Sequence, residues 1–337
     1  MTENLEIIAE LAQGFEGRPE QARLLLKAAA NAGASAAKFQ LVFADELATP
    51  DYKYFDLFRR LEMPDDVWRK LADDAKDLGI CLQLDIFGRR SLALAERIGV
   101  DAVKLHGTDI ANTGLLALVA QSPVRKVLLG AGGAHLSEIE HALTLLPGKS
   151  VVVLLGFQGY PTPVEDNQIV RVGELRGRLS GHPNVRVGFA DHAEPDSALS
   201  VALPALAVGA GATVLEKHLT LSKAMKLEDH EAALNPDEFA NFVTVMRSCE
   251  LALGACIPAN DFGMAPSEQK YRKTIRRHVV AARRLSAGTV LAPADVLLKR
   301  TSGDEVITEI ELVYGRKLTH DIAPNQAVVS GDLEELR

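Results

Sequence analysis

The amino-acid sequence predicts a closed parallel (β/α)8 barrel, the TIM-barrel fold, followed by a small and mostly β domain. Between residue 5 and about residue 254, short apolar runs alternate with longer segments of helical spacing, an order typical of α/β proteins with a parallel sheet. The apolar runs are nearly continuous, which indicates strands buried on both faces. Beyond about residue 275 this alternation gives way to turns and short strands, which predicts the second domain.

Eight apolar runs of strand length follow one another in the first part of the chain. An open doubly wound sheet is the alternative to a barrel, but no glycine-rich phosphate fingerprint follows the first run, so the barrel is favoured. The predicted strands cover residues 5–11, 35–42, 80–87, 101–107, 126–132, 150–157, 185–191 and 213–219.

The segments between these runs carry the start and stop signals of helices. Residues 18–33 have apolar side chains at helical spacing and end in glycine. Residues 64–79 begin with proline and two acids and also end in glycine, and residues 235–254 begin with Asn-Pro. Proline and acidic residues favour the first turn of a helix, and glycine favours its end.

The carboxyl-terminal part divides into a predicted linker, residues 256–275, and a predicted domain, residues 276–337, so that the barrel covers residues 1–255. The linker has scattered proline and glycine without a period. In the domain, residues 285–296 and 322–333 align over twelve positions, with Gly288 opposite Asn325 and Asp295 opposite Asp332. The repeat predicts a small pseudo-symmetric module that serves as a lid or a binding appendage.

Composition excludes several functional classes. The formal net charge of −8 argues against a nucleic-acid surface, which needs a basic footprint. No apolar run approaches the roughly 20 residues of a membrane span, and the amino terminus lacks the basic and apolar regions of a signal peptide. The three cysteines lack metal-type spacing, which is typical of reduced thiols. A cytoplasmic protein is predicted, without nucleic-acid or membrane partners.

Two of the predicted strands end in histidine. Active sites of parallel barrels lie at the carboxyl ends of the strands, so His192 and His218, from the seventh and eighth strands, are expected to lie close together. Neutral imidazoles bind manganese, iron, cobalt or zinc, and two protein ligands leave positions open for water or substrate. The alternative is that each histidine only caps its strand through a backbone hydrogen bond.

Two lysines, Lys38 and Lys104, lie inside apolar strands, where lysine is almost never buried without a partner. A pair of cations can hold an anionic phosphate. The alternatives are salt bridges to Glu10 or Asp85, or a Schiff-base lysine. Glu10 ends the first strand and either moves a proton of a hydroxyl or water or balances the charge of Lys38.

Several motifs, in this order, resemble the N-acetylneuraminate (sialic acid) synthase family over nearly the whole chain. They are IIAELAQGFEG, AANAGASAAKFQ, YPTPVED, ADH, LEKHLT and DHEAALNPDEF, and the final module resembles that family's antifreeze-like (SAF) domain. The family condenses phosphoenolpyruvate with an acylated amino-sugar aldehyde to give a nonulosonic, sialic-acid-like 2-keto acid. The resemblance therefore implies an enzyme of this type.

The resemblance also implies roles for individual residues. It implies that His192 and His218 hold a divalent metal, manganese before magnesium, cobalt or zinc, and that Glu10 is the catalytic acid and base. It implies a domain-swapped homodimer in which the small domain caps the partner's barrel. The substrate-binding residues that it implies are Lys38, Gln40 and Lys104 for phosphate, Tyr160 and Asp229 for the sugar, and Arg300 from the partner for the substrate amide.

Five positions depart from the family pattern. Asp85 replaces a serine or threonine, and Gly107 replaces a serine, although Thr108 beside it offers a hydroxyl. The other three, which in the family help to hold the phosphoenolpyruvate carboxylate, are Gly130, Gln158 and Ala190. Two alternatives therefore stay open, namely a metal-dependent aldolase or lyase with another keto acid and a non-catalytic protein that retains a sugar pocket. The acceptor sugar and the roles of Asp85 and His106 are not determined by the sequence.

Overall fold

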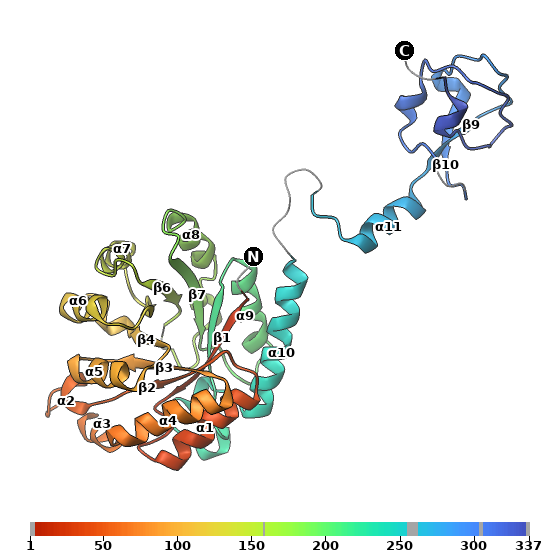
Figure 1. The fold of residues 1–337 in the computed structure, drawn as a ribbon. Coiled ribbons are helices and arrows are strands. Elements are labelled where there is room, and N and C mark those ends of the chain that lie inside the picture. Colours follow the sequence, from red (N-terminus) through yellow and green to blue (C-terminus); the bar gives the residue numbers. More distant parts are fainter. Residues whose placement is uncertain (1–3, 158, 255–261, 303–305, 335–337) are drawn as a thin grey trace. The chain divides into compact units, whose positions relative to one another are not determined.

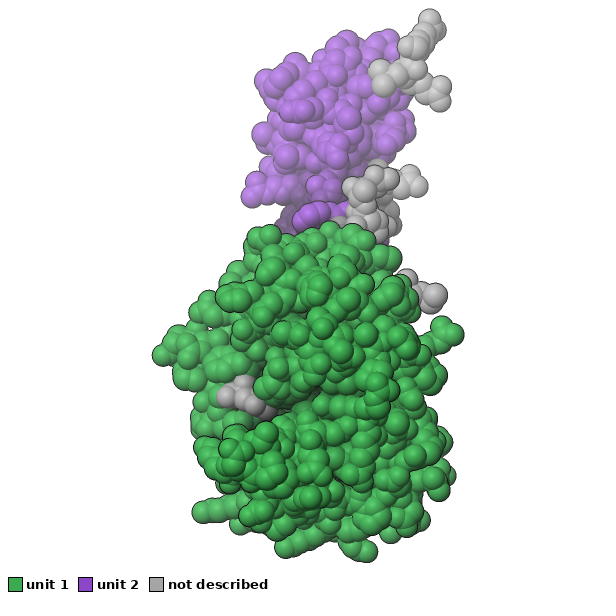
Figure 2. Space-filling view, turned by 90° about the vertical axis from the view of Figure 1, so that its left-hand side faces the viewer, with its two compact units in different colours: residues 1–254 green, residues 255–337 purple. Residues whose placement is uncertain are grey.

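A computed structural model describes residues 4–157, 159–254, 262–302 and 306–334 of the 337-residue chain. The chain divides into two compact units, Met1–Gly254 and Ala255–Arg337, which Figure 2 colours separately. Each unit has its own apolar core, and the two cores share no residue.

The first unit is a closed barrel of eight parallel strands in the order β1 to β8 (Figure 1), which confirms the predicted fold. Every predicted strand is present, with its ends shifted by at most two residues. The strands are β1 Glu6–Ala12, β2 Ala36–Gln40, β3 Cys81–Ile86, β4 Ala102–Leu105, β5 Lys126–Gly130, β6 Ser150–Leu155, β7 Val185–Asp191 and β8 Val214–His218.

Helices surround the barrel in Figure 1 and cover the outward faces of the strands. The three helices predicted from start and stop signals are α1, α4 and α10. Helix α10 begins with a capping box, in which Asn235 N donates to Glu238 Oε2 at 2.8 Å. The short helices α2 and α3 were not predicted. The helices are α1 Pro19–Asn31, α2 Ala44–Leu47, α3 Phe55–Leu61, α4 Asp65–Leu78, α5 Arg89–Ile98, α6 Thr113–Gln121, α7 Leu136–Thr144, α8 Val170–Arg178, α9 Leu199–Gly209 and α10 Pro236–Leu253.

Side chains that point into the barrel form layers, because alternate residues of each strand face the same side. The middle layer is apolar and includes Ile8, Leu128 and Val152. Toward the amino ends of the strands, Glu6 accepts hydrogen bonds from Gln83 and Arg186. Two residues further along β1, β2, β4 and β8 from this apolar layer, the inward side chains are charged, namely Glu10, Lys38, Lys104 and Glu216. The sequence therefore places an apolar plug beneath a charged layer at the carboxyl ends.

The second unit is built around the predicted repeat. Its sheet pairs β9 His278–Ala281 with β10 Val296–Lys299 in antiparallel register, and Leu285 bridges to Ile322, the first residue of each repeat copy. Gly288 and Asn325 both adopt positive φ, at 82° and 63°. Asp295 and Asp332 are both buried and accept a backbone hydrogen bond from the residue three positions before them. The aligned positions therefore perform the same local roles.

The predicted linker, residues 256–275, contains a helix that its sequence did not predict. Helix α11 covers Pro266–Ile275, with proline in its first turn. Its described side chains are nearly all exposed, and a helix without a buried face has no apolar period that the sequence could reveal. Within the described residues, no helix is both long and apolar enough to cross a membrane.

Candidate active site

A cavity opens at the carboxyl ends of the barrel strands and encloses about 660 Å³ of space free of atoms, part of it solvent. This is an ordinary size for a small-molecule site. The barrel brings seven of the predicted site residues to its wall, and they come from six different strands or the loops that follow them. These residues are Glu10, Gln40, Lys104, Thr108, Tyr160, His192 and His218.

The two predicted histidines lie side by side at the cavity wall. Their ring centroids are 5.1 Å apart, and the ring of Tyr160 lies edge-on to both, at 5.3 Å from His192 and 5.8 Å from His218. Both histidines are buried. Burial lowers the pKa of His192 to about 4 and holds the pKa of His218 well below its usual range. Both rings are therefore neutral at pH 7 and keep a lone pair available for a metal.

The described residues include no group of three or more histidine, cysteine or acidic side chains arranged to hold a metal ion. Nδ1 of His192 is buried and makes no hydrogen bond to any described residue. Two neutral imidazoles, one of them with an unpaired nitrogen, fit a cation whose other ligands are water or substrate. Two protein ligands leave most positions of a cation open, unlike the four protein ligands of a closed structural site.

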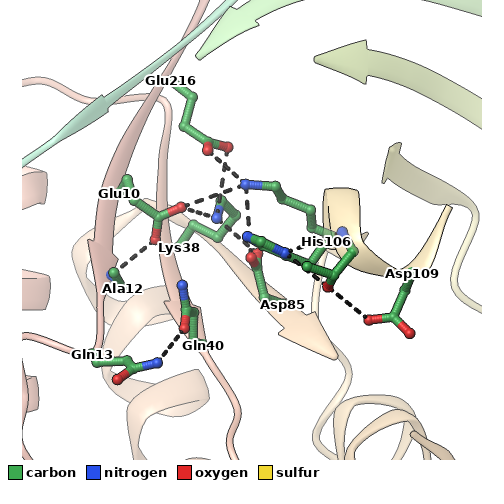
Figure 3. A network of polar contacts seen from close by, with 11 residues as sticks. Glu10, Ala12, Gln13, Lys38, Gln40, Asp85, His106, Asp109 and Glu216 are labelled. Carbon is green, nitrogen blue, oxygen red and sulfur yellow. Dashed lines mark hydrogen bonds and ion pairs between the residues drawn. The ribbon is translucent and has the colours of Figure 1, made fainter. Parts of the chain in front are cut away.

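Beneath and beside the histidines, five charged side chains form one network, drawn with its neighbours in Figure 3. Nζ of Lys38 lies 2.7 Å from Asp85 Oδ1, contacts Glu10 Oε2, and lies 3.6 Å from Glu216 Oε2. Nζ of Lys104 lies 2.7 Å from Glu216 Oε1 and 3.8 Å from Glu10 Oε2. Both lysines are therefore paired with carboxylates, as one sequence alternative predicted.

The two lysines differ in depth. Lys38 is fully buried and does not line the cavity, whereas Lys104 is 7% exposed and does. Of the three carboxylates, Glu10 and Glu216 line the cavity and Asp85 does not. A ligand in the cavity therefore meets one ammonium and two carboxyl groups directly.

Two carboxyl groups of the network, Glu10 and Glu216, have pKa values shifted in opposite directions. Burial raises the pKa of Glu10 to about 8, because the loss of solvation outweighs the attraction of Lys38. By contrast, Lys104 and Lys38 hold the pKa of Glu216 well below its usual range. Three carboxylates around two ammonium groups would carry a buried net charge, which the proton on Glu10 removes. Glu10 is then a proton donor at pH 7 and Glu216 a fixed anion.

The remaining predicted site residues are placed as follows. Nε2 of Gln13 donates to Gln40 Oε1 at 2.7 Å. Asp229 is half-buried, and its charge contributes to raising the pKa of Tyr160, so the two lie in one electrostatic environment. Arg300 is exposed and follows β10 in the second unit, and Gln158 lies outside the described residues.

One wall of the cavity is made of glycine backbone. A Cβ on Gly130 would lie 2.6 Å from the backbone nitrogen of Gly107, and one on Gly132 would lie 2.4 Å from the carbonyl oxygen of Gly156. Contacts this short do not occur in folded proteins, so a side chain at either position requires the facing backbone to move. A serine at position 130 therefore does not fit this backbone unchanged.

Two polar residues of the cavity wall, Glu216 and His106, had no predicted role. Glu216 precedes His218 by two positions in β8, so strand alternation puts both side chains on the inward face. His106 follows β4, and its Nδ1 lies 3.1 Å from Thr108 Oγ1. Burial, with the charge of Lys104, lowers the pKa of His106. The alternation of inward and outward side chains along β8 is the sequence signal that places Glu216 beside His218.

Comparison with known proteins gives the family of the chain. The NeuB family matches residues 25–257, and the SAF domain matches residues 276–334. The N,N'-diacetyllegionaminic acid synthase of Legionella pneumophila is 27% identical over 97% of this chain and 94% of its own length. The N-acetylneuraminate-9-phosphate synthase of Mus musculus is 27% identical over 85% of this chain and 80% of its own.

The solved N-acetylneuraminic acid synthetase of Leptospira borgpetersenii, in complex with citrate, is 26% identical, with a TM-score of 0.72 over 81% of this chain and 93% of its own. The family match covers more than half of the sequence and the whole cavity except Glu10. The protein therefore belongs to the NeuB family and carries a SAF domain at its carboxyl end.

Proposed function

We propose that the protein condenses phosphoenolpyruvate with the open-chain aldehyde of an acylated amino sugar, giving a nonulosonic 2-keto acid and inorganic phosphate. The observation that carries the proposal is the meeting of His192, His218, Tyr160, Glu10 and Lys104 in one cavity. Relatives named as synthases of legionaminic acid and of N-acetylneuraminate-9-phosphate support it. The names of these relatives are the reason for proposing an acylated amino sugar as the acceptor.

His192 and His218 fit a divalent metal, which we propose to be manganese, because two imidazoles leave most of its coordination to the oxygen atoms of water and substrate, which suit manganese. When bound, such an ion acts as a Lewis acid that polarises a carbonyl oxygen. Tyr160, edge-on to both rings, closes one side of this position. Its hydroxyl and the carboxyl group of Asp229 are proposed to bind the sugar hydroxyls.

Glu10 is proposed to move the protons of the reaction. As the donor C3 adds to the aldehyde carbon, the aldehyde oxygen gains a proton from the Glu10 carboxyl group, which is protonated at pH 7. The resulting carboxylate then takes a proton from the water that adds to donor C2. Collapse of that adduct forms the C2 carbonyl and breaks the C2–O bond to phosphate, and the hydroxyl proton leaves with the phosphate.

The raised pKa of Glu10 predicts that the free energy of unfolding depends on pH. Because the pKa of Glu10 is raised to about 8 from an ordinary value near 4.5 in the unfolded chain, the folded state binds more protons between these values. Stability should therefore fall as pH rises from 6.5 to 8, by at most about 2 kcal/mol. Urea unfolding at both pH values measures this loss, and Glu10→Gln should abolish it. An equal loss in Glu10→Gln would contradict the protonated state of Glu10.

Lys104 is proposed to bind the phosphate of the donor, together with Gln40 and Thr108, which line the same cavity. Lys104→Met should weaken binding of phosphoenolpyruvate by about 1.5–3 kcal/mol, the value of a lost charged hydrogen bond. Calorimetry measures the effect. Lys126→Met, which removes a lysine at the amino end of the same barrel, is the matched control. Equal affinity in the wild type and Lys104→Met would show that Lys104 does not contact the donor.

The proposed function is tested with a panel of N-acylated hexosamines, phosphoenolpyruvate and Mn²⁺. We expect at least one acceptor to yield a product whose mass equals acceptor plus donor plus water minus phosphoric acid, with equimolar phosphate release. A panel without product or phosphate release, from protein that contains metal, would contradict the proposal.

A second candidate is a metal-dependent aldolase that uses an unphosphorylated 2-keto acid. The observation in its favour is the glycine wall, because Gly107, Gly130 and Ala190 offer no hydroxyl to a donor carboxylate. The same panel with pyruvate in place of phosphoenolpyruvate separates the two, since product without any phosphate donor identifies the aldolase.

A further inference from the structure

Asp85 is a carboxylate that lies close to both lysines of the charged network. It is fully buried, and it does not line the cavity. Its Oδ1 accepts a hydrogen bond from Lys38 Nζ at 2.7 Å. Its Oδ2 makes no hydrogen bond to a described residue and lies 3.7 Å from Lys104 Nζ. Figure 3 shows the Asp85 carboxylate beside Lys38, on the side away from Glu216.

The position of Asp85 changes what an anion in the cavity meets. Register pairs Gln40 with Asp85 and Asp85 with Lys104 across neighbouring strands, so the carboxylate lies within the ring of strands that supplies the lysines. Lys38 donates to Asp85 and Glu10 and does not itself line the cavity. The positive charge of Lys38 is therefore compensated by these carboxyl groups, and Lys104 is attracted toward the Asp85 carboxylate.

Charge at this depth acts strongly on a ligand. Two unit charges a few ångströms apart in a protein interior interact by enough to change affinity more than tenfold, even at an effective dielectric constant of about 20. A phosphate carries close to two negative charges in addition to any carboxylate, so Asp85 repels a phosphorylated ligand more than an unphosphorylated one.

We propose that Asp85 is a positioning residue that sets the selectivity of the cavity between phosphorylated and unphosphorylated donors, by holding Lys38 below the cavity and compensating its charge. The inference rests on the proposed function, because it concerns the donor of that reaction. In the wild type, affinity for phosphoenolpyruvate should exceed affinity for pyruvate by less than about tenfold. Removal of the Asp85 charge should release Lys38 for the phosphate and widen that ratio.

The experiment measures calorimetric affinities of wild type, Asp85→Asn and Asp85→Ser for inorganic phosphate, phosphoenolpyruvate and pyruvate. Asn keeps the shape of the side chain and removes its charge. We expect both variants to bind phosphate and phosphoenolpyruvate about tenfold or more tightly than the wild type, with pyruvate changed by less than about threefold. A merely structural role predicts the opposite, since damage to the network lowers affinity.

Glu6→Gln is the matched control, because Glu6 is also paired with basic side chains inside the barrel, at the opposite ends of the strands. It should leave all three affinities unchanged. Unchanged or weaker binding of phosphate in the folded Asp85 variants would overturn the inference. If neither variant folds, the affinities of the wild type test the inference. A wild-type affinity for phosphoenolpyruvate about tenfold or more above that for pyruvate overturns the inference, and a smaller ratio supports it.

The inference and the proposed function can fail separately. Product formation with phosphoenolpyruvate in the wild type, without any gain of phosphate affinity in Asp85→Asn, would overturn only the role of Asp85. A gain of phosphate affinity in Asp85→Asn, without product from any acceptor, would overturn only the proposed reaction.

Discussion

Replacing His192 or His218 with alanine is expected to remove bound divalent metal and to lower turnover at least about a thousandfold. The two rings are neutral, buried and 5.1 Å apart between centroids, and the described residues offer no cluster of three such ligands to replace them. Loss of one imidazole therefore halves the protein ligands of the proposed metal. Loss of Lewis acidity at the aldehyde would cost several kcal/mol in the transition state.

The measurement is elemental analysis of protein reconstituted with Mn²⁺, together with the melting temperature with and without metal. Metal should raise the melting temperature of the wild type and not that of either variant, because a ligand stabilises only the state that binds it. His141→Ala, on the exposed face of α7, is the matched control and should retain metal. Metal content equal to the wild type in the double variant would show that the histidines hold no metal.

Much of the fold was predictable because its signals are local. Each barrel strand is a short apolar run, and α1, α4 and α10 carry their own start signals or bury an apolar face. The segments that were missed lack such signals. Helices α2 and α3 are only four and seven residues long, and α11 exposes nearly all of its described side chains. Periodicity reports burial, so a helix that buries little leaves little trace in the sequence.

The sequence predicts many of the residues that form the candidate site, but not which of them line the cavity. Strand alternation places Lys38 and Lys104 on the inward face alike, yet only Lys104 lines the cavity. That difference depends on Asp85 and Glu10, which come from other strands and pair with the Lys38 ammonium group. The glycine wall is likewise a property of facing loops, because Gly130 approaches the backbone of Gly107 rather than any neighbour in sequence. Contacts between distant segments of this kind have no local pattern.

Deletion of residues 276–337 is expected to leave a folded barrel that binds metal and turns over at least about a hundredfold more slowly than the full chain. The barrel should persist because its core is complete without any residue of the second unit. Turnover should fall because an uncovered cavity admits bulk water while the donor carbon adds to the aldehyde. We propose that the SAF domain closes the cavity of a partner chain in a homodimer, with Arg300 contacting the substrate amide. Circular dichroism, metal analysis and the acceptor assay measure the three properties.

Mixing the truncated chain with full-length His192→Ala should partly restore turnover, because the heterodimer contains one intact cavity and one SAF domain able to cover it. Neither homodimer has both. The matched control is full-length His192→Ala that also carries Arg300→Ala, which should restore less if Arg300 reaches the partner's substrate. Arg300 is exposed and directly follows β10, so its removal should not disturb the core of its own domain. Absence of recovery under conditions where heterodimers demonstrably form would exclude closure by the partner and leave closure within one chain, or none.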